Sequence, residues 1–232
     1  MTEVEYTKKR ARQKEISIRY IERPVEFLIK HNITPNTISF IGFVCSIVAS
    51  LLNALFGLYF SIYLSWIIPV IMGIGGAMDL FDGEVARRTG NETQAGAFLD
   101  SNLDRLSDAI CILGLIYGGL LSFLLGYIIL FLILMISYIR SRAENEGVNM
   151  KGIGIMERAE RILFLLFMII IELIFYFSTF LIYNDPITIS IPFITRVPVT
   201  PIFLIVIIIF TITLIYTVLQ RFKITFKTLK NQ

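Results

Sequence analysis

The chain has 232 residues, of which 56% are hydrophobic and 17% charged, and its mean hydropathy is +0.75. This balance excludes an ordinary soluble domain, and the length suits one membrane domain built from several helices. The net charge of +3 comes from Lys and Arg clusters beside apolar runs. We interpret that charge as a signal for membrane topology and contact with membrane lipids, and we expect no nucleic-acid binding.

The N-terminal segment, residues 1–35, is basic and lacks the apolar stretch of a cleavable signal peptide. Within it, residues 14–31 alternate apolar and charged side chains at helical spacing, with an interruption at Pro24. This pattern predicts an amphipathic helix that lies in the plane of the membrane interface. We therefore expect a basic cytoplasmic segment with an interfacial helix at 1–35, followed by a membrane domain at 36–232.

Six apolar runs follow, each close to the ~20 residues that a helix needs to cross a membrane. Their continuity, without alternating polar residues, favours helices over strands. The sequence thus predicts an all-α, polytopic membrane protein with six transmembrane helices and an N-terminal interfacial helix. The predicted spans are 38–58, 62–82, 98–124, 124–146, 156–183 and 199–222.

Basic residues gather on one side of this arrangement. Clusters occur at residues 8–30, 140–161 and 221–230, whereas the connections at 59–62 and 119–127 carry no Lys or Arg. The positive-inside rule then places both termini in the cytoplasm, together with the connection between the second and third spans. We expect a multi-pass protein of the cell membrane whose active site faces the cytoplasm.

An acidic region interrupts the apolar pattern between the second and third spans. Its carboxylates include Asp79, Asp82, Glu84, Asp100, Asp104 and Asp108. An ionisable group at membrane depth costs several kcal/mol, so such groups are usually paired, solvated or bound to ions. We expect Glu84, Arg88 and Glu92 to be surface residues, and we look for function among the aspartates.

Helical spacing places these aspartates on two faces that a turn through Gly90 can bring together. The first face, at i, i+3, i+4 and i+7, carries Asp79, Asp82, Gly83 and Ala86. The second face, at i, i+4 and i+8, carries Asp100, Asp104 and Asp108. Clustered carboxylate oxygens are the ligands that Mg²⁺ and similar hard cations prefer.

The pattern D-x-x-D-G-x-x-A-R-x8-G-x-x-x-D-x-x-x-D runs from Asp79 to Asp104 without a mismatch. It resembles the motif of the CDP-alcohol phosphatidyltransferase family, membrane enzymes that make phospholipids. The resemblance implies two divalent ions, Mg²⁺ or Mn²⁺, held by Asp79, Asp82, Asp100 and Asp104. It also implies that Asp104 is the catalytic base and that Asp108 supports the site. The residues expected to bind the CDP-lipid are Asn36, Asp79, Gly83, Ala86 and Arg87.

A second basic region contains the residues that indicate which substrate accepts the transferred group. Residues 137–161 contain Arg140, Arg142, Arg158 and Arg161, and Arg221 closes the last span. Arginines that converge on one place suit a phosphate group, through forked hydrogen bonds. The positive-inside rule explains basic residues here as well, so composition alone leaves both interpretations open.

Further motifs favour the phosphate pocket. The strings S-Y-I-R-S-R-A-E, E-R-A-E-R and V-L-Q-R, which start at residues 137, 157 and 218, are similar to bacterial phosphatidylinositol-phosphate synthases and archaeal archaetidylinositol-phosphate synthases. The resemblance implies that inositol 1-phosphate is the acceptor, that CMP is released, and that the protein is a homodimer. The residues implied to bind the acceptor phosphate are Arg140, Arg142, Arg158 and Arg221.

Three alternatives stay open. Glycerol 3-phosphate would need the same phosphate-binding arginines as inositol 1-phosphate. A cation transporter would explain intramembrane aspartates but not Gly83, Ala86 and Arg87 at fixed offsets. A prenyltransferase would usually need more spans and two separated aspartate motifs. The lipid of the donor, diacyl or archaeal diether, is not distinguished by these residues.

Overall fold

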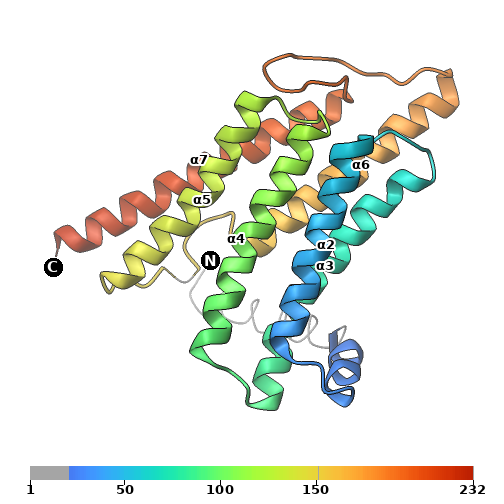
Figure 1. The fold of residues 1–232 in the computed structure, drawn as a ribbon. Helices are drawn as coiled ribbons and strands as arrows, with labels where there is room; N and C mark the ends of the chain where they lie inside the picture. Colours follow the sequence, from blue (N-terminus) through green and yellow to red (C-terminus); the bar gives the residue numbers. More distant parts are fainter. Residues whose placement is uncertain (1–20, 151, 232) are drawn as a thin grey trace, which may run out of the picture.

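The computed structural model describes residues 21–150 and 152–231, and helices account for most of them. Residues 21–30 are helical and precede six long helices and one short 3-10 helix, η1 (Leu64–Trp66). The long helices are α2 (Pro35–Phe56), α3 (Ile67–Thr89), α4 (Gln94–Tyr117), α5 (Phe123–Asn145), α6 (Arg158–Tyr183) and α7 (Pro201–Lys230). They form one elongated bundle (Figure 1), which confirms the all-α, six-helix prediction.

Five of these helices are long and apolar enough to cross a membrane. The sixth, α4, has 24 residues and therefore a length of about 36 Å, at ~1.5 Å per residue. It lies beside the others in the bundle (Figure 1), but its charged residues, including Asp100 and Asp104, lower its apolar content. We read α4 as the sixth span of a multi-pass membrane protein.

The connection between α4 and α5 differs from the prediction. The predicted spans met at residue 124, whereas α4 ends at Tyr117 and α5 begins at Phe123. Gly119 adopts a φ of 85°, which breaks the helix, and Ser122 caps α5 by accepting a hydrogen bond from Leu125 N at 3.1 Å. Leu121 is fully buried in this turn, so its hydropathy indicates a packed connection rather than a continuing span.

Two helices extend past their predicted ends. The second span was predicted to end at residue 82, but α3 continues to Thr89. The last was predicted to end at residue 222, but α7 continues to Lys230. At 30 residues, α7 is about 45 Å long, more than the ~30 Å of a membrane core. Charged residues in both extensions are helical, although they lie outside the apolar runs.

Small residues allow the helices that carry the site to approach closely. A Cβ at Gly42 of α2 would lie 3.2 Å from the carbonyl oxygen of Gly75 on α3, and a Cβ at Gly114 of α4 would lie 2.8 Å from Ser50 of α2. Such contacts are typical of helix pairs in membranes. As a result α2 packs against both α3 and α4, which fixes the two helices relative to each other.

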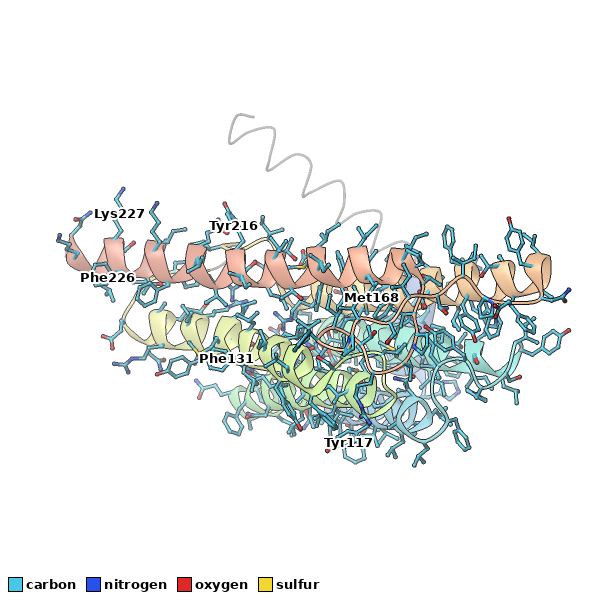
Figure 2. The ribbon with its side chains drawn as sticks, turned by 90° about the horizontal axis from the view of Figure 1, so that it is seen from above. Tyr117, Phe131, Met168, Tyr216, Phe226 and Lys227 are labelled. Atoms are coloured by element: carbon cyan, nitrogen blue, oxygen red, sulfur yellow. The ribbon has the colours of Figure 1, made fainter. Side chains whose placement is uncertain are left out.

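The bundle has a buried apolar centre and an apolar exterior. Figure 2 shows Met168 of α6 inside the bundle and Tyr117, Phe131 and Tyr216 at its periphery. Met168 is 1% exposed, whereas Phe131 of α5 is 61% exposed. An exterior this apolar suits contact with lipid chains and not with water.

The end of the bundle that carries residues 184–200 lies opposite the α3–α4 turn (Figure 1). Here Glu172 of α6 is fully buried and accepts hydrogen bonds from Tyr59 and from the backbone and hydroxyl of Thr200, the N-cap of α7. The network ties the connection after α2 to α6 and α7. It holds the far end of the bundle without contributing to the acidic region.

The described part of the predicted interfacial helix packs on the same end as the α3–α4 turn. Val25 is fully buried with Ile38 of α2 and Val85 of α3. Residues 21–30 are helical without a break at Pro24, so the predicted interruption there was wrong. Residues 14–20 of the prediction lie outside the described residues, and the proposed boundary at residue 35 stays a prediction.

Candidate active site

The α3–α4 connection brings the two aspartate faces together. Gly90 ends α3 in the left-handed conformation, with a φ of 68°, and Asn91 N donates to Ala86 O at 3.0 Å. Thr93 then caps α4 by accepting a hydrogen bond from Gly96 N at 3.0 Å. This short turn joins α3 and α4 at one end of the bundle, where each packs against α2 and their aspartate faces meet.

Three aspartates form a compact cluster at this point. Carboxylate oxygens of Asp79, Asp82 and Asp100 lie within 4.8 Å of one another. Asp82 is only 6% exposed, and it accepts a hydrogen bond from the Ser39 hydroxyl at 2.6 Å. Three oxygen ligands from two rigid helices, one oriented by Ser39, are suited to a divalent cation.

Asp104 stands one helical turn beyond this cluster and has a different partner. Its Oδ1 lies 2.9 Å from Nη1 of Arg158 on α6, and the same nitrogen contacts Asp79. One turn further, buried Asp108 pairs with buried Arg161 at 2.6 Å. Along this face of α4, Asp100 therefore belongs to the carboxylate cluster, whereas Asp104 and Asp108 pair with arginines.

A first cavity, of about 210 Å³, opens between α2, α3 and the start of α4. Its lining includes four of the residues that the sequence suggested for the CDP-lipid: Asn36, Gly83, Ala86 and Arg87. A Cβ at Gly83 would meet no other atom within 4 Å, so the glycine widens this cavity. Arg87 is more than half exposed and pairs with Glu84 at 2.7 Å.

A narrow space of about 40 Å³ continues from this cavity into the bundle. Asp82 and Asp100 border both spaces, whereas Asp79 borders only the inner one, together with Asp104 and Arg158. The aspartate cluster therefore lies along the passage from the first cavity to Asp104. Asp79 therefore lies beside the predicted donor site but does not line the first cavity itself.

A second cavity, of about 500 Å³, lies on the other side of Asp104. Its lining includes Arg140, Arg158 and Arg221, three of the four arginines suggested for the acceptor phosphate. It also includes residues that the site prediction had not assigned: Ser101, Arg105, Ser137, Ser141, Glu157 and Arg161. Arginines from four helices thus converge on one space next to Asp104.

Arg142 is not brought to this cavity. It pairs with Glu146 at 2.5 Å and lines a separate, mainly apolar groove between α5 and α7. Arg140 and Arg142 are two residues apart, and helix positions with that spacing do not face the same way. The helical spacing of the sequence already contains this signal, which separates Arg142 from the other three arginines.

The arginines of the second cavity are held by protein groups and still have donors to offer. Arg221, 2% exposed, donates from Nε to Ile153 O and from Nη1 to Ile136 O, both at 2.8 Å. The Nε atoms of Arg158 and Arg161 are buried and have no hydrogen-bond partner within the described residues. A buried donor without a partner is costly, so both atoms favour an anionic ligand.

Two residues of the site, Arg161 and Ser39, were not assigned a role from the sequence, for different reasons. Arg161 lies three residues after Arg158, a spacing that puts both on one helix face, so the E-R-A-E-R string contained a usable signal. Ser39 reaches Asp82 across 43 residues of sequence. That contact depends on how α2 packs against α3, which no local pattern reveals.

Comparison with known proteins agrees with this geometry. The family model for CDP-alcohol phosphatidyltransferase matches residues 32–228, which covers all six long helices almost completely. Archaetidylinositol phosphate synthase of Pyrococcus horikoshii is 38% identical over 62% of this chain and 72% of the relative. The synthase of the same name from Methanothermobacter thermautotrophicus is 48% identical over 41% of this chain and 49% of the relative.

A bacterial relative and a solved structure extend the comparison. Phosphatidylinositol phosphate synthase of Corynebacterium glutamicum is 30% identical over 62% of this chain and 65% of the relative. The crystal structure of Mycobacterium tuberculosis phosphatidylinositol phosphate synthase with CDP-DAG bound has the same fold, with a TM-score of 0.61 and 24% identity over 89% of this chain and 94% of that one. The chain belongs to the CDP-alcohol phosphatidyltransferase family of membrane enzymes.

Proposed function

We propose that this enzyme transfers a phosphatidyl-type group, archaetidyl or diacyl, from a CDP-lipid to inositol 1-phosphate and releases CMP. One observation carries the proposal: the aspartates of α3 and α4 lie between two cavities of different chemistry. The lining of the first includes Asn36 and the small residues Gly83, Ala86 and Gly96, and the lining of the second includes five arginines and four carboxylates. Synthases of inositol phosphate lipids are also among the relatives that share 30% or more of their aligned residues.

The first cavity suits the donor. Gly83 and Ala86 leave room for a flat nucleotide base, and Asn36 offers both a donor and an acceptor for hydrogen bonds. Arg87, at the exposed rim, can turn from Glu84 towards a phosphate, because an exposed ion pair contributes little to stability. In this proposal the cytidine lies in the first cavity and the diphosphate extends towards the aspartates.

We propose that the site binds two ions of Mg²⁺ or Mn²⁺. Their ligands would be Asp79, Asp82 and Asp100, with Asp104 contributing nearby. When bound, such ions offset the negative charge of the diphosphate and of the departing CMP. Ser39 keeps the carboxylate of Asp82 turned towards the cluster. This role needs no other chemistry from the three aspartates.

Asp104 borders both the narrow space and the second cavity, so it can reach a hydroxyl of the acceptor. In the proposed reaction that hydroxyl loses its proton to Asp104, and its oxygen forms a bond to the phosphorus next to the lipid. The bond from this phosphorus to the CMP oxygen breaks, and CMP leaves with the electron pair. Arg158 holds the Asp104 carboxylate in place for the proton transfer.

The second cavity suits the acceptor phosphate through Arg140, Arg158 and Arg161, with Arg221 positioning the wall. Arg142 is left out of this pocket because it lines another groove. We further propose that the site faces the cytoplasm. In support, the outer connection 184–200 carries Arg196 as its only basic residue, whereas Arg87, Arg88 and the end of α7 add positive charge at the other side. The homodimer stays a prediction.

Acceptor exchange tests the proposal. Purified protein in detergent, with a CDP-lipid and Mg²⁺, is given inositol 1-phosphate, glycerol 3-phosphate, free inositol or no acceptor, and CMP release is measured. We expect release with inositol 1-phosphate to exceed that with the other acceptors by at least about tenfold. Release that depends on glycerol 3-phosphate alone would replace the proposed acceptor. No release with any acceptor phosphate would contradict the proposal.

A further inference from the structure

One carboxylate of the second cavity neither takes part in the proposed reaction nor forms an ion pair within the described residues. Its acidic lining residues are Asp104, Asp108, Glu144 and Glu157. The first three form ion pairs with Arg158, Arg161 and Arg140 respectively. No ion pair within the described residues includes Glu157. This residue therefore needs a separate explanation.

Glu157 does not serve its own helix. It is the N-cap residue of α6, but its side chain makes no capping hydrogen bond. Glutamate is not among the residues favoured at this position, which are Ser, Thr, Asp and Asn. Glu157 lines the second cavity, and its Oε1 atom is buried without a hydrogen-bond partner among the residues that the structure describes. A buried carboxylate oxygen in this state is costly unless a ligand supplies a donor.

The cavity thus offers two unpaired functions. Arg158, Arg161 and Glu157 all line it, and within the described residues each has a buried polar atom without a partner: a donor Nε in both arginines and an acceptor Oε1 in Glu157. Phosphate oxygens match the donors but are repelled by a carboxylate, so the part of the ligand beside Glu157 must be a hydrogen-bond donor. A free cation fits poorly, because five of the lining residues are arginines: Arg105, Arg140, Arg158, Arg161 and Arg221.

We propose that Glu157 is a specificity-determining residue that accepts hydrogen bonds from the hydroxyl groups of a phosphorylated polyol. The inference rests on the proposed function, and it adds the residue that recognises the polyol part of the acceptor. A charged acceptor oxygen binds hydroxyl donors more strongly than a neutral one. Glu157 therefore favours an acceptor with several hydroxyls, such as inositol 1-phosphate, over glycerol 3-phosphate.

The test replaces Glu157 with Gln and uses Glu160→Gln as the control. Glu160 lies in the same first turn of α6, is exposed and does not line the cavity, so its variant removes the same charge from the same helix. Binding of inositol 1-phosphate and of inorganic phosphate is measured by calorimetry with the purified full chain, and KM and kcat are measured from CMP release.

For E157Q we expect Kd and KM for inositol 1-phosphate to rise about tenfold, with kcat and the Kd for inorganic phosphate within about twofold of wild type. E160Q is expected to match wild type in all four quantities. Equal weakening of inorganic phosphate and inositol 1-phosphate in E157Q would show a general electrostatic or structural role and overturn the inference. Unchanged values in E157Q would also overturn it.

A wild-type measurement and a second variant distinguish the possible causes of a negative result. The wild-type protein is measured first: no CMP release with inositol 1-phosphate refutes the proposed function, whereas normal release with equal KM in wild type and E157Q refutes only the role of Glu157. If E157Q does not fold, Glu157→Asp keeps the charge but withdraws it by one methylene. E157D is then expected to raise KM for inositol 1-phosphate selectively, and a wild-type KM would overturn the inference.

Discussion

Nη1 of Arg158 lies 2.9 Å from Oδ1 of Asp104, and this ion pair joins the first turn of α6 to the aspartate face of α4. The same nitrogen contacts Asp79 on α3. One guanidinium thus links the aspartate cluster, the proposed base and the second cavity. The Asp104 carboxylate that this contact holds borders the narrow space and the second cavity.

Replacement of Arg158 tests that dependence. Lysine keeps the charge but loses the planar set of donors that contacts two carboxylates, so we expect Arg158→Lys to lower kcat/KM by about tenfold or more. Arg158→Ala is expected to lower it by about a hundredfold. CMP release at varied acceptor concentration measures both. Arg88→Lys is the control, since Arg88 pairs with Glu84 at 2.9 Å away from both cavities, and a wild-type value for R158K would contradict this role.

Arg140 and Arg142 provide a matched comparison. Both lie near the end of α5, and each pairs with a glutamate four residues later, at 3.0 and 2.5 Å respectively. Only Arg140 lines the second cavity. We expect Arg140→Gln to raise KM for the acceptor about tenfold, and Arg142→Gln to change it less than about twofold. Equal effects in steady-state kinetics would return Arg142 to the acceptor pocket.

The buried pair of Asp108 and Arg161 is expected to behave as a unit. Both side chains are less than a tenth exposed, and they lie 2.6 Å apart. Removal of one partner leaves a buried charge, which costs about 3–5 kcal/mol in soluble proteins. Thermal unfolding in detergent should therefore show Asp108→Leu and Arg161→Leu each less stable than the double variant. A double variant as unstable as the sum of the two single variants would contradict coupling.

A substitution at Gly83 is expected to affect substrate binding without affecting stability. Leucine there would extend into the first cavity, where its Cβ meets no atom within 4 Å, and glycine within a helix costs up to about 1 kcal/mol relative to better helix formers. We expect Gly83→Leu to keep the melting temperature and to raise KM for the CDP-lipid at least tenfold or so. Gly73→Ala, whose Cβ would make an ordinary contact at 3.7 Å with Leu166, should leave that KM unchanged. An unaltered KM in G83L would place the donor elsewhere.

Local spacing predicted what a single helix decides. Asp79 and Asp82 share a face because three residues make nearly one helical turn, and the same reasoning joined Asp100 to Asp104. It did not distinguish the cluster of Asp79, Asp82 and Asp100 from Asp104, because that distinction depends on where α6 places Arg158. Contacts between distant segments, such as Ser39 with Asp82, lay beyond any spacing rule.

Hydropathy predicted the number of helices better than their ends. Leu121 is as apolar as a lipid-facing residue, yet it is buried in the turn before α5, where Ser122 N donates to Ile194 O at 2.8 Å. Conversely, Lys227 is charged but helical, because α7 extends past the apolar run. The hydropathy of a residue indicates whether it avoids water, and a residue avoids water both in a packed turn and in a membrane span.

The most direct measurement of the division within the acidic region compares Asp104→Asn with Asp100→Asn, two substitutions that remove the same charge one turn apart on α4. Mn²⁺ binding and CMP release are measured on both variants. We expect D104N to bind Mn²⁺ nearly as well as wild type but to release CMP at least about a hundredfold more slowly, whereas D100N loses both functions. Near-normal CMP release by D104N, or a loss of Mn²⁺ binding as complete as that of D100N, would contradict the assignment of Asp104 as the base.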